Sequence, residues 1–499
     1  MQLALSLALT QPQYVGGSAP PEPVGAHATA LTSTPTVHYH AGDSAATLSS
    51  GRVTAADDLM GLADVTGGSG GNGGPLELTD ALGRKFWRFE GSEYLNIAAA
   101  LEAVSSQALA VFMVGRFHRN RTSNPIFGLG NVALGTQLNT NGVTFQVSGS
   151  SNTAPMLRTA NRNANSFDTT PENGMAGSQL QVAGFVSRNS GNGGVRFYRN
   201  ETTVTNGSAL TVTSATSASG AGAEIGRYPQ APSTAGNWAE FDLYELVIYK
   251  GSAGAVLSNA EADVVAAELV ANWEIPALTD TLVVEGDSIT QGWTGITSGD
   301  CLSMTLTDPG EDGTVPGSWL VVNTGASGNT IANLVARRDT ALAWPNFKIS
   351  GGRSVVAVQI GANNYSGMTA ADIYAGICDL IDTTTTGYAQ RGWETCCAVN
   401  IATANGTNQP KVLDLRTLLR DLTTFRSDCG GLTAQQLRIA DLPLITVGGS
   451  TRFEDAADAG NLTYYDSDGL HPSETGSYHM GRGGDTLANG YAQRAVATS

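Results

Sequence analysis

The spacing of apolar segments changes once along this chain, near residue 275, and this change limits the folds open to it. From Phe86 to Tyr249, short apolar segments alternate with turns rich in glycine and asparagine, as around 143–147 and 194–198. Many short strands without helical periodicity predict an antiparallel β-sandwich. After Thr281, strand-like apolar runs alternate with helical stretches. That alternation predicts a parallel sheet with helices on both faces.

The length of 499 residues is too great for a single core, so we expect a multidomain chain. The predicted parts are an N-terminal arm (1–34), an all-β sandwich (35–275) and an α/β domain (278–499). The strands predicted in the α/β domain are 282–285, 320–323, 355–360, 395–401 and 442–447. The predicted helices are 258–273, 330–343, 370–381 and 412–425, followed by one near the C-terminus.

Polar segments follow the first three predicted strands of the α/β domain, where the chemistry of parallel sheets is found. Ser288 stands where a strand ends and a helix begins, which exposes its hydroxyl and aims its backbone N–H at the same space. The loop 323–330 contains Gly325 and Gly328, and a glycine there lets a backbone N–H approach a ligand closely. The loop 361–364 contains Asn363 and Asn364, and an asparagine amide can hold a developing oxyanion.

A fourth segment, 468–472, precedes the predicted C-terminal helix and contains Asp468 and His471. A histidine three residues after an aspartate can direct one ring nitrogen at the carboxylate and the other at a serine. Taken singly, each of the four segments would be a turn, a loop or a surface pair. Their occurrence together, in this order, favours an active site.

The four segments resemble the SGNH (GDSL) hydrolase family over about residues 278–499. The resemblance implies a flavodoxin-like three-layer fold and a serine esterase that needs no cofactor. It implies that Ser288 is the nucleophile, that His471 is the general base and that Asp468 orients His471. It further implies an oxyanion hole formed by the backbone N–H groups of Ser288 and Gly328 and by the side-chain amide of Asn363.

One position departs from the family pattern. An aspartate usually follows the oxyanion-hole asparagine, and this chain has Asn364 there. Because that residue generally shapes the loop, we expect a local change rather than a loss of activity. Substrate orientation is the property that the change puts in question.

The region 35–275 resembles concanavalin-like, laminin-G-like jelly-roll domains. The resemblance rests on the segments 87–95 and 244–249 and on a short helix ending in Asn272-Trp273. Such domains bind glycans as often as they serve as spacers. The whole layout, with a short apolar start at Met1–Leu9, is similar to tail-associated proteins of bacterial viruses. That start lacks the positive segment of a secretory signal, so it favours docking on other virion proteins.

The composition excludes several partners. The formal net charge of −17 argues against nucleic acid and against anionic membrane surfaces. The five cysteines show no CxxC spacing, so neither a disulfide framework nor a zinc site is expected. The N-terminal histidines lack companion ligands, so no metal site is expected there either. Two of them, His38 and His40, alternate along a predicted strand, which is typical of a polar surface.

The sequence therefore predicts an extracellular serine esterase that removes acetyl or other small acyl groups from a polysaccharide. Association with a phage virion is favoured over classical secretion, which stays an alternative. Trp293, close behind Ser288, could stack on a sugar ring or belong to the core. One alternative is a glycan-binding structural protein with an inert hydrolase domain. Another is a lipase or thioesterase on the same fold.

Overall fold

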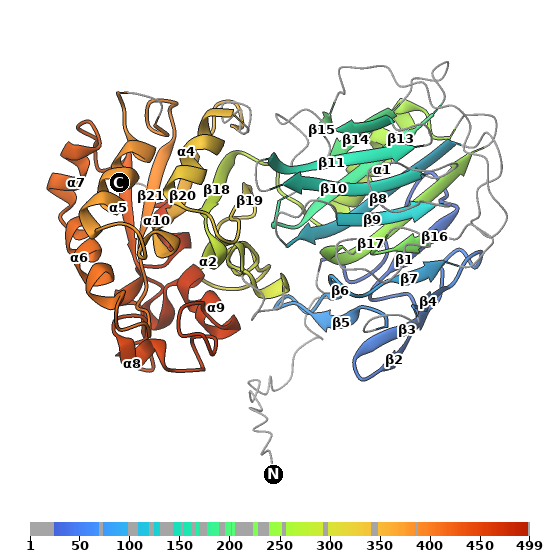
Figure 1. The fold of residues 1–499 in the computed structure, drawn as a ribbon. Helices are drawn as coiled ribbons and strands as arrows, with labels where there is room; N and C mark the ends of the chain where they lie inside the picture. Colours follow the sequence, from blue (N-terminus) through green and yellow to red (C-terminus); the bar gives the residue numbers. More distant parts are fainter. Residues whose placement is uncertain are drawn as a thin grey trace, which may run out of the picture.

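The computed structural model of the 499-residue chain contains a large curled antiparallel sheet, jelly-roll-like in form, and a separate α/β region built on a parallel sheet (Figure 1). The structure describes residues 24–68, 73–97, 108–118, 124–129, 143–150, 153–161, 165–168, 177–188, 195–200, 202–204, 223–227, 239–251, 256–292, 298–340, 348–384 and 387–497.

The antiparallel part takes up the first half of the chain. Its strands are β1 (Val37–His40), β2 (Ala46–Ser49), β3 (Arg52–Ala56), β4 (Val65–Gly67), β5 (Leu76–Thr79), β6 (Lys85–Glu90), β7 (Leu95–Ile97), β8 (Ala108–Phe117), β9 (Asn124–Leu129), β10 (Val143–Ser150), β11 (Thr153–Asn161), β12 (Asn165–Asp168), β13 (Gln181–Ser187), β14 (Val195–Arg199), β15 (Thr202–Val204), β16 (Ala223–Ile225) and β17 (Glu240–Gly251).

Strand β17 organises this sheet, since it pairs antiparallel with β1, β6 and β8. Its register against β8 shifts once, between Leu243 and Glu245. Before the shift, Phe241 and Leu243 face the inner core of the sheet; after it, Leu246 and Ile248 do so. The extra residue therefore reverses the period-2 alternation while keeping apolar side chains on the core face.

The other face of β17 packs against α1 (Asn259–Asn272), with Tyr244 and Val247 contributing to that second core. The predicted helix 258–273 coincides with α1. Ser258 is its N-cap and accepts from the backbone of Glu261, whose carboxylate bonds back to the Ser258 N–H. This capping box satisfies two N–H groups at the start of the helix.

His38 and His40 are buried, so the prediction of a polar surface for this strand was wrong. His38 Nε2 lies 2.6 Å from a carboxylate oxygen of Glu245 on β17. The ring of His40 packs on Trp273, with centroids 5.5 Å apart. Both rings are accommodated because polar groups of neighbouring elements meet them. The described part of the predicted arm also packs here, since Thr29 donates to Glu245 through its backbone and its hydroxyl.

The α/β region has five parallel strands in the order β19-β18-β20-β21-β22. Apolar cores lie on both faces of the sheet. The strands are β18 (Asp280–Gly286), β19 (Trp319–Asn323), β20 (Ser354–Gln359), β21 (Glu394–Val399) and β22 (Leu437–Asp441), and a small hairpin joins β23 (Thr446–Val447) to β24 (Ser450–Thr451). The helices are α2 (Ser288–Gln291), α3 (Leu302–Thr305), α4 (Ile331–Thr340), α5 (Ala370–Ile381), α6 (Gln409–Arg420), α7 (Leu422–Asp428), α8 (Ala456–Ala459), α9 (Glu474–Arg482) and α10 (Tyr491–Val496).

Two predicted elements differ from the structure. The fifth strand is 437–441 rather than 442–447, because Pro443 lies in a 3-10 turn and a polar residue, Arg438, lies in the true strand. Arg438 bonds Glu394 on the neighbouring strand at 2.9 Å, which is why a charged residue fits there. The predicted helix 412–425 is two helices, because Asp421 leaves the helical conformation and caps α7.

The two regions meet in a polar seam. Arg116 on β8 donates to Asp308 at 2.9 Å and to the Met304 carbonyl at 2.7 Å. The backbone N–H of Ser178 donates to the carbonyl of Val321 on β19 at 2.9 Å. These three hydrogen bonds cross the seam and satisfy buried polar groups on both sides of it.

Candidate active site

Ser288 is the first residue of α2 and follows β18 after a single linking residue, Asp287. Asp287 caps the helix by accepting the Ile289 N–H at 3.0 Å. Gly286, the last residue of β18, has no room for a side chain, since a Cβ there would lie 2.2 Å from the Gln359 carbonyl oxygen. This tight turn between strand and helix places Ser288 at the carboxyl edge of the sheet, as predicted from its position in the sequence.

The Ser288 hydroxyl, the imidazole of His471 and the carboxylate of Asp468 form a chain of hydrogen bonds. Ser288 Oγ lies 2.7 Å from His471 Nε2, and His471 Nδ1 lies 2.5 Å from Asp468 Oδ2. Asp468 Oδ1 also accepts the backbone N–H groups of Leu470 and His471, at 2.9 and 3.0 Å. Asp468 is thereby held in one orientation, and it directs the proton of His471 to Nδ1 so that Nε2 can accept from Ser288.

Two carboxyl groups at this site, those of Asp468 and Asp287, have opposite pKa shifts. Burial raises the pKa of Asp468, but the hydrogen bonds from the backbone and ring of His471 outweigh it and leave the pKa below its usual range. Asp287 is fully buried, and burial raises its pKa to about 6. Asp468 therefore stays ionised at neutral pH and can stabilise a charged His471.

The loop after β19 is tied to the turn that carries Ser288. The backbone N–H of Ala326 and the side-chain amide of Asn329 both donate to the carbonyl of Gly286, at 3.2 and 3.3 Å. Gly325 passes so close to α2 that a Cβ there would lie 2.6 Å from the Gln291 nitrogen. Gly328 is exposed beside Asn329 and has a φ of +79°, which glycine adopts without strain.

The loop after β20 is bonded to the same segment. Asn363 is exposed, and its Nδ2 donates to the Asn329 carbonyl at 2.9 Å. Asn364 is buried, and its Oδ1 accepts the N–H of Ile331, the first residue of α4, at 3.2 Å. Asn364, the departure from the family pattern, thus joins the two loops through an acceptor oxygen that an aspartate would also provide.

The structure brings Ser288, Asp468 and His471 into direct contact, and it joins the loops of Gly328 and Asn363 through bonds to Asn329. Asn329 itself was not singled out from the sequence, although it directly follows Gly328. Asp287 was missed as well, because its burial depends on how the loops close over it. Trp293 lies outside the described residues.

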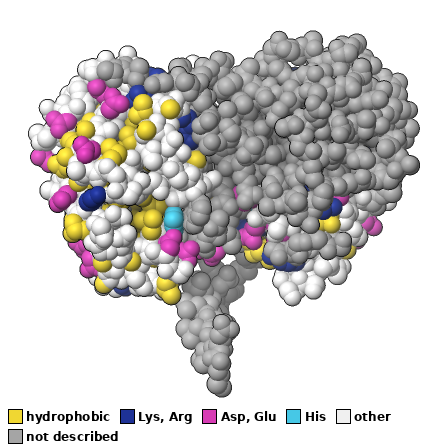
Figure 2. Space-filling model, viewed as in Figure 1, with side chains coloured by type: hydrophobic (Ala, Val, Ile, Leu, Met, Phe, Trp, Pro, Cys, Tyr) yellow, Lys and Arg dark blue, Asp and Glu magenta, His cyan; other side chains and the backbone are white. Residues whose placement is uncertain are grey.

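The described residues contain no cluster of three or more histidine, cysteine or acidic side chains able to hold a metal ion. The five cysteines are all buried. Within the same described segments, no helix has both the length and the apolar character that crossing a membrane requires. Figure 2 shows acidic side chains spread over the visible face of the α/β region, with basic ones between them, in keeping with the net charge of −17.

Comparison with known proteins gives limited similarity. No protein-family model matches the chain, and no curated protein matches it. Among solved structures, a member of the lipolytic G-D-S-L family from Veillonella parvula has 15% identity and a TM-score of 0.30, covering 40% of this chain and 92% of its own. Domain 4 of AbnA, a GH43 extracellular arabinanase from Geobacillus stearothermophilus in complex with arabinotriose, has 17% identity and a TM-score of 0.31, covering 46% and 96%. The CBM40 domain of Ruminococcus gnavus IT-sialidase has 12% identity and a TM-score of 0.26, covering 39% and 96%.

Proposed function

We propose that this protein is a serine ester hydrolase of the SGNH type. The observation that carries the proposal is the unbroken chain of hydrogen bonds from Ser288 through His471 to Asp468. A serine whose proton can pass to an oriented imidazole is an activated nucleophile. The proposed catalytic residues are those three, within a proposed domain 278–499 that follows a proposed sandwich domain 35–275.

In the proposed reaction, Ser288 Oγ attacks the ester carbonyl while His471 Nε2 takes its proton. The tetrahedral oxyanion accepts from the backbone N–H groups of Ser288 and Gly328 and from the second amide hydrogen of Asn363. A single donor of this kind stabilises the transition state by about 2.7–4 kcal/mol. His471 then protonates the leaving alcohol, and water repeats the sequence on the acyl-enzyme.

We propose a polysaccharide that carries acetyl or similarly small acyl groups as the substrate. Support comes from the arrangement of the chain, in which a jelly-roll-like sheet lies directly against the α/β region. Gly328 and Asn363 are exposed at the carboxyl edge of the sheet, so the approach to Ser288 is polar rather than apolar. A lipase or thioesterase on the same fold would prefer long acyl chains. The rates on p-nitrophenyl acetate, octanoate and palmitate separate the two, and a strong preference for palmitate would exclude the carbohydrate substrate.

We propose an extracellular, virion-associated location, with the N-terminal arm 1–34 bound to other virion proteins. The support is the composition, which is low in charge and rich in glycine. Mass spectrometry of the exported protein tests this location. An N-terminus found at residue 15–30 would point to a classically secreted enzyme instead.

The decisive experiment measures acetate release from acetylated bacterial and plant polysaccharides by the wild-type chain and by Ser288→Ala. Release by the wild type alone supports the esterase and its nucleophile. If neither the polysaccharides nor p-nitrophenyl acetate is cleaved, the chain is better explained as a glycan-binding structural protein with an inert hydrolase domain.

A further inference from the structure

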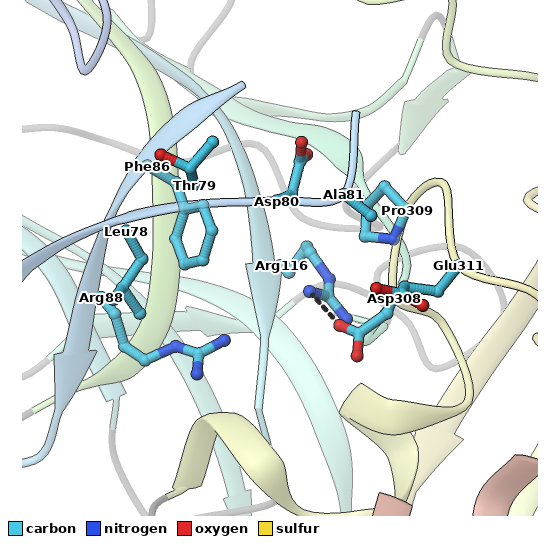
Figure 3. Close-up of a pocket in the computed structure, with 10 residues that line it drawn as sticks. All are labelled: Leu78, Thr79, Asp80, Ala81, Phe86, Arg88, Arg116, Asp308, Pro309 and Glu311. Carbon is cyan, nitrogen blue, oxygen red and sulfur yellow. Dashed lines mark hydrogen bonds and ion pairs between the residues drawn. The ribbon is translucent and has the colours of Figure 1, made fainter. Parts of the chain in front are cut away.

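A short helix of the α/β region, α3, lies against the end of β8 in the antiparallel region. The Cys301 thiol and the Ser303 hydroxyl donate to the carbonyl of His118, at 3.1 and 2.9 Å. Arg116 donates to a carbonyl of the same helix at 2.7 Å, and Figure 3 shows it also bonded to Asp308. The three donor side chains are buried. Because breaking such bonds would leave buried polar groups unsatisfied, they fix α3 on the end of β8.

His118 is anchored in turn by the core of the antiparallel region. Its Nε2 lies 3.0 Å from Oδ1 of Asp242 on β17, and both side chains are fully buried. The strand that leads to it, β8, pairs with β17 from Ala108 to Phe117. The carbonyl that accepts from Ser303 is therefore held by both the ring of its own residue and the sheet.

Ser303 also bonds toward the turn that carries Ser288. Its hydroxyl oxygen accepts from Asn323 Nδ2 at 3.3 Å, and the same amide nitrogen donates to the carbonyl of Thr290 in α2 at 2.9 Å. The amide nitrogen has two hydrogens, one for each acceptor. Helix α2 has four residues and ends at Gly292, so its last carbonyls need partners from outside the helix. Asn323 supplies the partner for Thr290.

The other end of the Asn323 amide holds the loop that contains Gly328. Its Oδ1 accepts the backbone N–H of Gly325 at 2.9 Å. The N–H of Gly328, in the same loop, is a proposed oxyanion donor. Asn323 is buried, so protein groups rather than bulk water set the orientation of its amide. A rotation of this amide would therefore disturb both α2 and the loop.

We propose that Ser303 is a positioning residue, through which the antiparallel region holds Ser288 and the oxyanion loop in place. This proposal rests on the proposed esterase function. Ser303 accepts from Asn323 and donates to His118, which keeps the amide in a single orientation. Without the hydroxyl, one amide hydrogen of Asn323 is left buried and unsatisfied. Turning the amide to recover a partner would release α2 or the oxyanion loop. The antiparallel region then contributes to the reaction whether or not it binds a glycan.

The test compares Ser303→Ala with Thr307→Val, its matched control, in the full-length chain. Both hydroxyls are buried, they lie four positions apart, and both cross the seam, since that of Thr307 donates to the Ser178 carbonyl at 2.8 Å. The remaining bonds of Thr307 go to Arg116 and to carbonyls of its own segment. We expect the two variants to melt at similar temperatures, because each loses a buried hydrogen bond across the seam.

Two readouts separate positioning from stability. On p-nitrophenyl acetate, Ser303→Ala should lower kcat about tenfold and change KM little, because the reacting groups are displaced while the small substrate keeps its contacts. Hydrogen exchange followed by mass spectrometry reports on the segment 286–292 without any substrate. Exchange of this segment should be roughly threefold faster in Ser303→Ala, because α2 opens more easily. Thr307→Val should match the wild type in kcat and in the exchange of 286–292.

The outcomes distinguish this proposal from the proposed function. If the wild type cleaves the ester, and Ser303→Ala equals Thr307→Val in kcat and exchange, the esterase stands and the positioning role is overturned. If the wild type cleaves no ester, the esterase fails and the exchange of 286–292 decides alone. Faster exchange in Ser303→Ala only would then support the link from the antiparallel region to α2, and equal exchange in both variants would overturn it.

Discussion

Arg116 and Asp308, 192 residues apart in the sequence, are joined by a 2.9 Å hydrogen bond across the seam between the two regions. Arg116 is fully buried and also lies 3.5 Å from Asp242 on β17. The guanidinium thus links a carboxylate of the antiparallel sheet to one of the α/β region. An ion pair shared in this way makes the stability of the seam depend on Asp242.

Replacing Asp242 with Asn is expected to destabilise the protein by about 3–5 kcal/mol, because it leaves buried cations without their carboxylate. Asp242 is fully buried, with Arg88 at 2.9 Å and His118 at 3.0 Å. The matched control is Asp300→Asn, which removes a 3.5 Å contact of the same Arg88 from a side chain that is 36% exposed. The control is expected to cost less than about 1 kcal/mol. Urea unfolding measures both, and equal losses would contradict the prediction.

The effect of Asp242 depends on pH. Burial raises its pKa, but Arg88 and His118 outweigh burial and hold the pKa well below the usual range. The stabilisation by Asp242 is therefore fully present above the unfolded-state pKa of about 3.9 and is lost as the pH falls below it. In urea unfolding, the difference in the free energy of unfolding between wild type and Asp242→Asn should become smaller below pH 4.

Replacing Asp468 with Asn is expected to lower kcat by about 10⁴-fold, as a reversed tautomer does in serine proteases. An amide N–H facing His471 Nδ1 would donate rather than accept, so the ring proton would move to Nε2. Nε2 could then no longer accept the proton of Ser288. Asn keeps an oxygen for the backbone N–H groups of Leu470 and His471, so folding is preserved. The kcat on p-nitrophenyl acetate measures the loss of activity, and the melting temperature measures whether the fold is preserved. An unchanged kcat would refute the role of Asp468 in orienting His471.

Replacing Asp287 with Asn is expected to stabilise the protein at neutral pH. Burial raises the pKa of Asp287 to about 6, whereas an unfolded aspartate has a pKa near 3.9. The folded state then holds more protons between these values, so wild-type stability falls as the pH rises from about 4 to 6. Above that window the loss reaches about 3 kcal/mol, and the variant avoids it.

Unfolding at pH 4 and pH 7 measures the effect of Asp287→Asn. The variant and the wild type should be similar at pH 4, and the variant should be more stable at pH 7. Asp414→Asn, on the exposed face of α6, is the control and should change neither value. A variant less stable than wild type at pH 7 would show that the Asp287 carboxylate is needed as an anion.

Replacing Gly325 with Ala is expected to lower kcat by about 10²-fold with the fold intact, since small misplacements of reacting groups have costs of that size. The new Cβ would lie 2.6 Å from the Gln291 nitrogen and 2.9 Å from the Thr290 carbonyl carbon, so α2, which begins with Ser288, has to shift. Gly406→Ala is the control, because a Cβ there meets nothing within 4 Å. Equal activity of the two variants would show that α2 tolerates the displacement.

Local patterns in the sequence were enough to predict the alternation of strands and helices and the position of Ser288 at a strand end. Both features follow from periodicity and from turn residues, which act within a few positions of the chain. The predicted helix 370–381, for example, has the same bounds as α5. The same patterns failed at Arg438, where a charged residue lies in a strand because Glu394 on its neighbour pairs with it.

Only the tertiary structure decided the remaining features. The pairing of β17 with three strands, the contact of Arg116 with Asp308 and the burial of Asp287 all join residues distant in sequence. Such contacts depend on how whole elements pack, and no local propensity encodes them. The order of the segments that carry Ser288, Gly328, Asn363, Asp468 and His471 could be read from the chain, whereas the hydrogen bonds that now join them required the fold.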